Sequence, residues 1–124
     1  MNKNIKIKIG NIELKAVLND SLTAKAIGEA LPITASFSTW GKEIYFSIPV
    51  KLDLEKGQEV VEMGDLGYWP PGSAFCIFYG TTPMSRETEI RPASAVTIFG
   101  KITGNISSLQ NVSGDQIMIE GETE

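Results

Sequence analysis

Hydrophobic and polar residues alternate along the first part of the chain. Isoleucines at every second position of residues 5–9 are separated by lysines, and the alternation resumes over residues 12–18. A period of two is typical of half-buried β-strands. The link between the segments is Gly10-Asn11, and both residue types tolerate the positive φ of a tight turn. The pattern therefore predicts an antiparallel hairpin over residues 3–18.

The spacing of apolar residues becomes helical after Asp20. Asp20 is a suitable N-cap, and Pro32 interrupts the segment. We therefore expect one main α-helix at about 21–31, which would plug or flank an otherwise β domain. The apolar residues at helical spacing are Leu22, Ala26 and Ala30, with Ile27 and Leu31 beside them.

The rest of the chain predicts short strands joined by turns. Residues 74–79 are apolar throughout, which favours a central strand covered on both faces, by a barrel interior and by the helix. Glycines and prolines in 64–72 indicate successive turns. Residues 81–94 form either a functional lid or a plain exposed loop, and residues 106–112 one helical turn. The expected strands are 33–39, 42–48, 59–63, 74–79, 95–102 and 115–121.

Composition indicates one small domain. The 124 residues are 42% hydrophobic, which is enough for a single core, so we expect one domain over residues 1–124. A net charge of −4 without a basic cluster argues against nucleic acid and membrane surfaces as partners. No apolar run approaches the about 20 residues of a membrane span, and no signal peptide is evident, so we expect a cytoplasmic protein. Monomer and oligomer are both compatible with the sequence.

Several kinds of chemistry are absent from the sequence. The chain has no histidine, which removes the usual general base, Ser-His and Cys-His pairs, and histidine metal sites. The single cysteine, Cys76, lies in the most hydrophobic predicted strand, where burial raises the pKa of a thiol and makes it inert. We therefore expect no metal and no cofactor, and these absences weigh against an enzyme.

Aromatic and charged residues supply the candidates for a site. The aromatic residues of 39–46 and 67–71 either line an apolar pocket or pack in a barrel core. Alternation along the strand places Tyr45 at the surface. Glu43 and Asp65 are candidate acid or base groups, but we assign no catalytic residue. The ligand-binding candidates are Trp40, Glu43, Tyr45, Tyr68, Trp69, Met84 and Arg91.

Three blocks of sequence resemble a prokaryotic family of small cyclophilin-like proteins, distant relatives of the cyclophilin peptidyl-prolyl isomerases. The blocks are residues 40–50, 64–72 and 92–96, which read WGKEIYFSIPV, GDLGYWPPG and PASAV. The resemblance covers nearly the whole chain. It implies a mainly β fold, a cyclophilin-like closed β-barrel with few helices, and a biochemical function that is unassigned.

True cyclophilins share two shorter pieces with the chain. Residues 72–77 are similar to their Gly-Ser-Gln-Phe-Phe-Ile strand, and residues 99–102 to their Phe-Gly-Lys-Val. This resemblance implies that Cys76 replaces a pocket phenylalanine and Val96 the pocket histidine, with Arg91 near the pocket tryptophan.

The cyclophilin catalytic arginine lies in Phe-His-Arg-x-Ile-Pro, and anchoring this motif on Ile48-Pro49 puts Phe46 at its position. Isomerisation needs a donor that stabilises a twisted amide, and phenylalanine has none. Arg91 would have to replace it from the loop.

Three functions follow from these observations. The first is a binding module that holds a peptide or small molecule in an aromatic-rimmed groove, which the replaced isomerase positions and the lack of histidine favour. The second is a peptidyl-prolyl isomerase with rearranged machinery. The third is an assembly subunit in which Tyr68, Trp69 and the adjoining prolines form a dimer patch.

Overall fold

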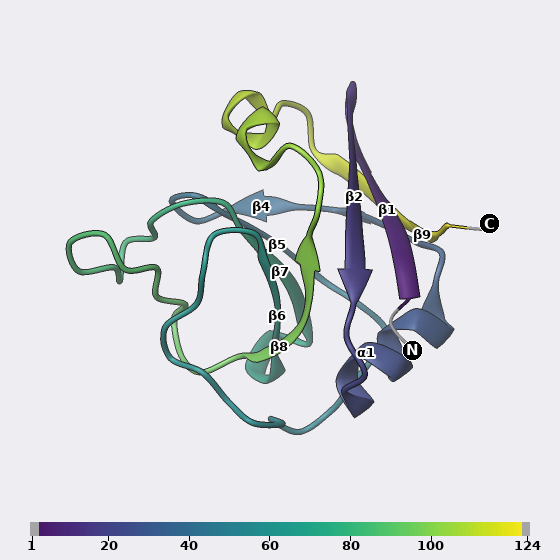
Figure 1. The fold of residues 1–124 in the computed structure, drawn as a ribbon, viewed down its shortest axis with the longest axis horizontal. Helices are drawn as coiled ribbons and strands as arrows, with labels where there is room; N and C mark the ends of the chain where they lie inside the picture. The colour runs from purple at the N-terminus through teal and green to yellow at the C-terminus, as the bar shows by residue number, and fades with distance from the viewer. Residues whose placement is uncertain (1–2, 123–124) are drawn as a thin grey trace.

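The computed structural model describes residues 3–122, which form one antiparallel sheet of nine strands, one α-helix and two 3₁₀ turns (Figure 1). The elements are β1 (Lys3–Ile9), β2 (Ile12–Leu18), α1 (Leu22–Ala30), β3 (Ile33–Ser36), β4 (Ser38–Thr39), β5 (Glu43–Ser47), β6 (Asp65–Trp69), η1 (Pro70–Gly72), β7 (Ala74–Phe78), β8 (Thr97–Ile102), η2 (Ile106–Asn111) and β9 (Gln116–Gly121).

The sheet is a nearly closed barrel. Its strand order is β3-β9-β1-β2-β8-β6-β7-β5-β4. The two end strands, β3 and β4, belong to one chain segment, residues 33–39, with only Phe37 between them. Because the same segment supplies both ends of the sheet, the sheet curls round on itself. The predicted mainly β barrel is thus confirmed.

The predicted N-terminal hairpin is confirmed. β1 and β2 pair in register from Lys3 opposite Leu18 to Ile9 opposite Ile12. Gly10, in the turn, has a φ of +57°, the left-handed conformation that glycine adopts without strain. The alternate isoleucines of β1 are buried in the barrel interior, as their period of two requires.

The helix is present, but its cap and its buried face differ from prediction. Ser21, not Asp20, is the N-cap, and its Oγ accepts a hydrogen bond from the N–H of Ala24 at 3.0 Å. Leu22, expected on the buried face, is 75% exposed. The carboxylate of Glu55 accepts hydrogen bonds from the first turn, so a contact distant in sequence helps to set the helix's orientation. The residues that α1 buries are Thr23, Ala24, Ile27 and Gly28.

No helix within residues 3–122 is long and apolar enough to cross a membrane.

One strand prediction and part of one turn prediction are wrong. Residues 59–63 form no strand in the described chain and make only an isolated bridge between Val61 and Ile90. Residues 65–69, predicted as turns, are instead the central strand β6. Its Gly67 marks close packing, because a Cβ there would lie 2.9 Å from Val96 Cγ2. Within residues 64–72, turns are thus found only at Gly64, before β6, and at η1, after it.

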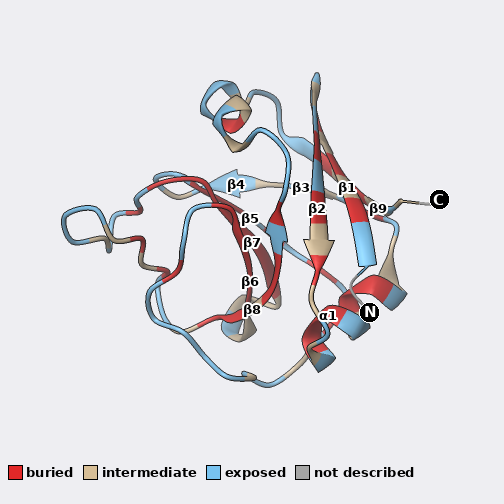
Figure 2. Ribbon diagram, in the orientation of Figure 1, coloured by how far each residue is buried: buried red, intermediate tan, exposed pale blue. Residues whose placement is uncertain are grey.

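The strand β7 is buried on both faces, as predicted, but the helix does not cover it. One face lies in the barrel interior, where Phe75 stacks on Phe46. Loop segments cover the other face, and Figure 2 shows β7 coloured as buried. This outer cluster consists of Val61, Ala74, Cys76, Phe78, Ile90 and Val96.

Candidate functional site

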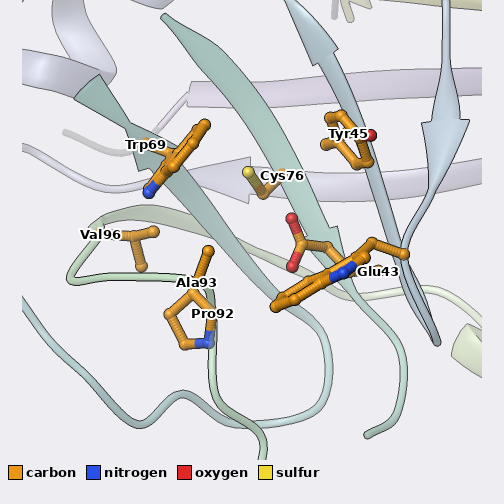
Figure 3. Close-up of a pocket in the computed structure, with 8 residues that line it drawn as sticks. Glu43, Tyr45, Trp69, Cys76, Pro92, Ala93 and Val96 are labelled. Carbon is orange, nitrogen blue, oxygen red and sulfur yellow. The ribbon is translucent and has the colours of Figure 1, made fainter. Parts of the chain in front are cut away.

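A pocket of about 280 Å³ lies beside the outer cluster (Figure 3). That volume is just below the usual range for ligand sites, about 300–1,000 Å³, and suits a compact group. Its walls come from β5, β6, β7 and the chain before β8. The lining residues are Trp40, Glu43, Tyr45, Trp69, Cys76, Pro92, Ala93 and Val96.

Strand register explains why the sheet side of this pocket forms. Tyr45 on β5 pairs with Cys76 on β7, which in turn pairs with Gly67 on β6. Paired residues point to the same face of a sheet, as do residues two apart along a strand. Glu43 and Trp69 therefore join this row on the outer face. Because Gly67 has no side chain, Val96 packs close to the sheet there.

The turn before β5 holds Trp40 at the pocket. The backbone N–H of Trp40 donates to Glu43 O at 2.9 Å, and the N–H of Glu43 donates back to Trp40 O at 3.2 Å. Gly41 between them has a φ of +61°, and a Cβ there would lie 2.9 Å from Thr81 O. Glycine is thus needed both for the turn and for the close approach of the neighbouring loop. The turn predicted at residues 40–42 is confirmed.

Trp69 is held in place from two sides. Its indole Nε1 donates to the Oγ of Ser94 at 2.7 Å. Its ring lies against Gly72, where a Cβ would come within 3.0 Å of Cζ3. Since the hydrogen bond joins β6 to the segment before β8, it ties the opposite walls of the pocket together.

The loop wall is anchored at several points. Val96 exchanges two backbone hydrogen bonds with Gln58, at 2.8 and 3.0 Å. Thr82, which is buried, donates its hydroxyl to Arg91 O. The Oγ of Ser85 accepts from the N–H of Arg91 at 3.1 Å. Pro92 and Ala93 are therefore fixed at the pocket although they lie in an irregular segment.

Glu43 is the one carboxyl group in the lining. It is only 6% exposed, and its Oε1 has no hydrogen-bond partner among residues 3–122. Burial raises the pKa of Glu43 to about 7, and the adjacent Cys76 thiol offsets part of that rise. Figure 3 shows the carboxylate pointing into the space that Trp69, Cys76 and Ala93 surround. A buried oxygen without a hydrogen bond lowers the free energy of unfolding, so a hydrogen-bond donor on a bound ligand would be stabilising at this position.

Cys76 is the buried, unpaired thiol that the sequence predicted. Burial raises the pKa of Cys76 well above its usual value, and the negative charge of Glu43 raises it further. A thiol that stays protonated is a poor nucleophile. Cys76 therefore contributes shape and polarizability to the pocket rather than nucleophilic chemistry.

The structure brings together four of the seven ligand-binding candidates. Trp40, Glu43, Tyr45 and Trp69 line the pocket. Tyr45 is 37% exposed, as alternation predicted.

The other three candidates lie elsewhere. Tyr68 is fully buried, and its hydroxyl donates to Val50 O at 2.6 Å. It points into the barrel because it neighbours the outward-facing Trp69 on β6. Met84 is an exposed loop residue. The Nε of Arg91 donates to the Glu89 carboxylate at 2.7 Å, outside the lining. Asp65 likewise serves a local role, because its Oδ2 accepts from Glu62 N at 2.8 Å.

The remaining lining residues escaped prediction from the residues alone. Pro92, Ala93 and Val96 are small apolar residues of a loop, and such residues carry no chemical signature. The only signal was the resemblance to cyclophilins, which put Cys76 and Val96 at pocket positions, and both do line the pocket. Phe46, the position matched to the catalytic arginine, faces the barrel interior and is 3% exposed. Its neighbour Tyr45 faces the pocket instead.

Comparisons with known proteins agree with this fold. The model of the cyclophilin-like family matches residues 3–120. The solution structure of a hypothetical protein from Archaeoglobus fulgidus superposes with a TM-score of 0.82 at 36% sequence identity, covering 98% of this chain and 95% of that one. No curated protein matches the chain. With a family match over nearly its whole length, the chain belongs to the cyclophilin-like family.

Proposed function

We propose that this protein is a binding module whose outer pocket holds a small molecule or a single side chain of a peptide. The observation that carries the proposal is the convergence of Trp40, Tyr45 and Trp69 around the buried carboxyl of Glu43, whose Oε1 has no hydrogen-bond partner among residues 3–122. Aromatic walls with few, well-placed polar groups are typical of small-molecule sites. The pocket is also pre-organised, because Trp69 and the loop wall are fixed by hydrogen bonds. Pre-organisation lowers the entropy that binding must overcome.

The lining favours binding over isomerisation. Stabilising a twisted proline amide requires a hydrogen-bond donor aimed at the reacting group. None of the described lining residues is basic, and the indole N–H of Trp69 is already donated to Ser94, so the Trp40 indole and the Tyr45 hydroxyl are the neutral donors left in place of a guanidinium. Arg91, the replacement donor suggested by the sequence, is paired with Glu89.

The tryptophans provide a direct assay. The chain contains two, Trp40 and Trp69, and both line the pocket. A fragment library screened by thermal shift and by intrinsic tryptophan fluorescence should give compounds that raise the melting temperature and change the emission together. Tyr45→Ala should weaken their binding, whereas Met84→Ala, an exposed side chain outside the lining, should not. Absence of any binder, or equal weakening by both variants, would refute the proposal.

Isomerisation is the second candidate, on one specific observation. Cys76 and Val96, which the resemblance matches to isomerase pocket residues, both line this pocket. A protease-coupled assay with a proline peptide tests it, and we expect no rate above the uncatalysed one. If the protein catalyses the reaction and Tyr45→Ala loses this activity, the protein is an isomerase and the binding proposal is wrong.

The alternative of a dimer patch that includes Tyr68 is weakened, since Tyr68 is fully buried.

A further inference from the structure

The pocket has a marked charge asymmetry. Its titratable lining groups are Glu43, Tyr45 and Cys76, and the other lining residues are apolar or indole side chains. The basic residues nearest in sequence lie elsewhere, because the Lys42 side chain runs along Gly80 and Arg91 pairs with Glu89. Negative charge is therefore the only formal charge that the pocket can present. The net charge of −4 adds a weak field of the same sign.

The position of the carboxyl explains what would complement it. Glu43 Oε1 is buried and accepts no hydrogen bond within residues 3–122. The adjacent Cys76 thiol is a weak donor whose Sγ also lies 3.9 Å from Ala74 O. A ligand that carries N–H donors and a positive charge would supply both the missing hydrogen bond and the missing countercharge.

The aromatic side chains favour the same kind of ligand. The electron-rich faces of tryptophan and tyrosine attract cations, most strongly where water is excluded. Trp40, Tyr45 and Trp69 stand around a carboxyl group in one small pocket. An anion would meet repulsion from Glu43 and would find no basic partner in the lining. The combination of aromatic walls and a buried carboxyl thus discriminates by charge.

We infer that the pocket takes an organic cation, a protonated amine attached to a small apolar body, with the ammonium group at Glu43 and the body between the aromatic side chains. This inference rests on the proposed binding function. The cavity of about 280 Å³ limits the ligand to a compact amine or to one cationic side chain of a peptide.

Matched probes of different charge test the inference. Phenylethylamine, phenylethanol and phenylpropionate share a body but are cationic, neutral and anionic, and the 3-methylbutyl series gives an aliphatic equivalent. Binding is measured by tryptophan fluorescence and calorimetry at about pH 8, where aliphatic amines are protonated. In at least one series the amine should bind at least about tenfold tighter than the alcohol, a difference of about 1.4 kcal/mol, and the acid should bind more weakly still.

Two variants identify the source of the preference. Glu43→Gln should reduce the amine-to-alcohol ratio to near one. Glu29→Gln removes the same charge from an exposed site on α1 and should keep the ratio. An alcohol or acid that binds as tightly as its amine would overturn the charge inference while leaving the binding function standing. Failure of both series in every charge state overturns the inference, and the fragment screen then decides the binding function separately.

Discussion

The buried carboxyl of Glu43 should make the stability of this protein fall as the pH rises. The folded protein holds the Glu43 proton until about pH 7, whereas an unfolded chain releases it near the ordinary value of 4.5. The folded state therefore binds more protons between these values. The contribution of this group is fully present below about pH 4.5 and is lost as the pH rises through about 7.

The size of the effect follows from the difference in pKa. A change from 4.5 to about 7 is equivalent to about 3 kcal/mol of unfolding free energy. Because Glu43 borders a pocket, solvent screening reduces this value. We therefore expect about 2 kcal/mol. The glutamine of Glu43→Gln cannot ionise. The unfolding free energy of this variant, relative to that of the wild type, should therefore rise by about 2 kcal/mol between pH 5 and pH 8.

Urea unfolding at several pH values, followed by tryptophan fluorescence, measures the effect. The relevant quantity is the difference in unfolding free energy between variant and wild type at each pH. Burying the amide of the glutamine changes this difference by the same amount at every pH, so it does not affect the pH dependence. Glu29 lies on the exposed face of α1. The unfolding free energy of Glu29→Gln should therefore change with pH in the same way as that of the wild type. If the difference between Glu43→Gln and the wild type stays constant from pH 5 to pH 8, the carboxyl is not held neutral by burial and this reasoning fails.

Three further predictions concern the scaffold. Tyr68→Phe removes the hydroxyl that donates to Val50 O, so it should lower the unfolding free energy by about 1–3 kcal/mol in urea titrations; an unchanged midpoint would contradict this role. Ser21→Ala should lower the unfolding free energy by about 1 kcal/mol through loss of the helix cap. Thermal melts should show a larger decrease in melting temperature for Ser21→Ala than for Asp20→Ala, and the reverse order would assign the cap to Asp20. Cys76 should react with iodoacetamide at neutral pH only as fast as the protein opens, so rapid labelling of the native protein would show an accessible thiolate.

Regular patterns in the sequence predicted much of the barrel. Alternation over residues 5–9 and 12–18 determined which faces of β1 and β2 are buried, because the period of a strand leaves no other choice. The same rule placed Tyr45 on the outer face. Such local predictions succeed where the pattern and the tertiary fold agree.

The errors arose where distant contacts decide the structure. Gly67 suggested a turn, yet it lies in strand β6, where its missing side chain leaves space for Val96. Leu22 had the right spacing for a buried face, but Glu55 contacts the first turn of the helix from elsewhere in the chain. The pocket likewise depends on contacts between residues that are distant in sequence. Its aromatic residues were visible in the sequence and Val96 was suggested by the resemblance, whereas Pro92 and Ala93 became recognisable as lining residues only from the fold.

The pairing of the first strand with the last suggests how the molecule can be re-engineered. β1 lies between β2 and β9 in the sheet order, and the N–H of Glu122 donates to Asn4 O at 3.1 Å. A short peptide can therefore connect Glu122 to Lys3 without disturbing the barrel. New ends opened within the exposed residues 86–88 would give a circular permutant in which a reporter domain is attached close to the pocket wall, and ligand binding could then be read from a fused sensor.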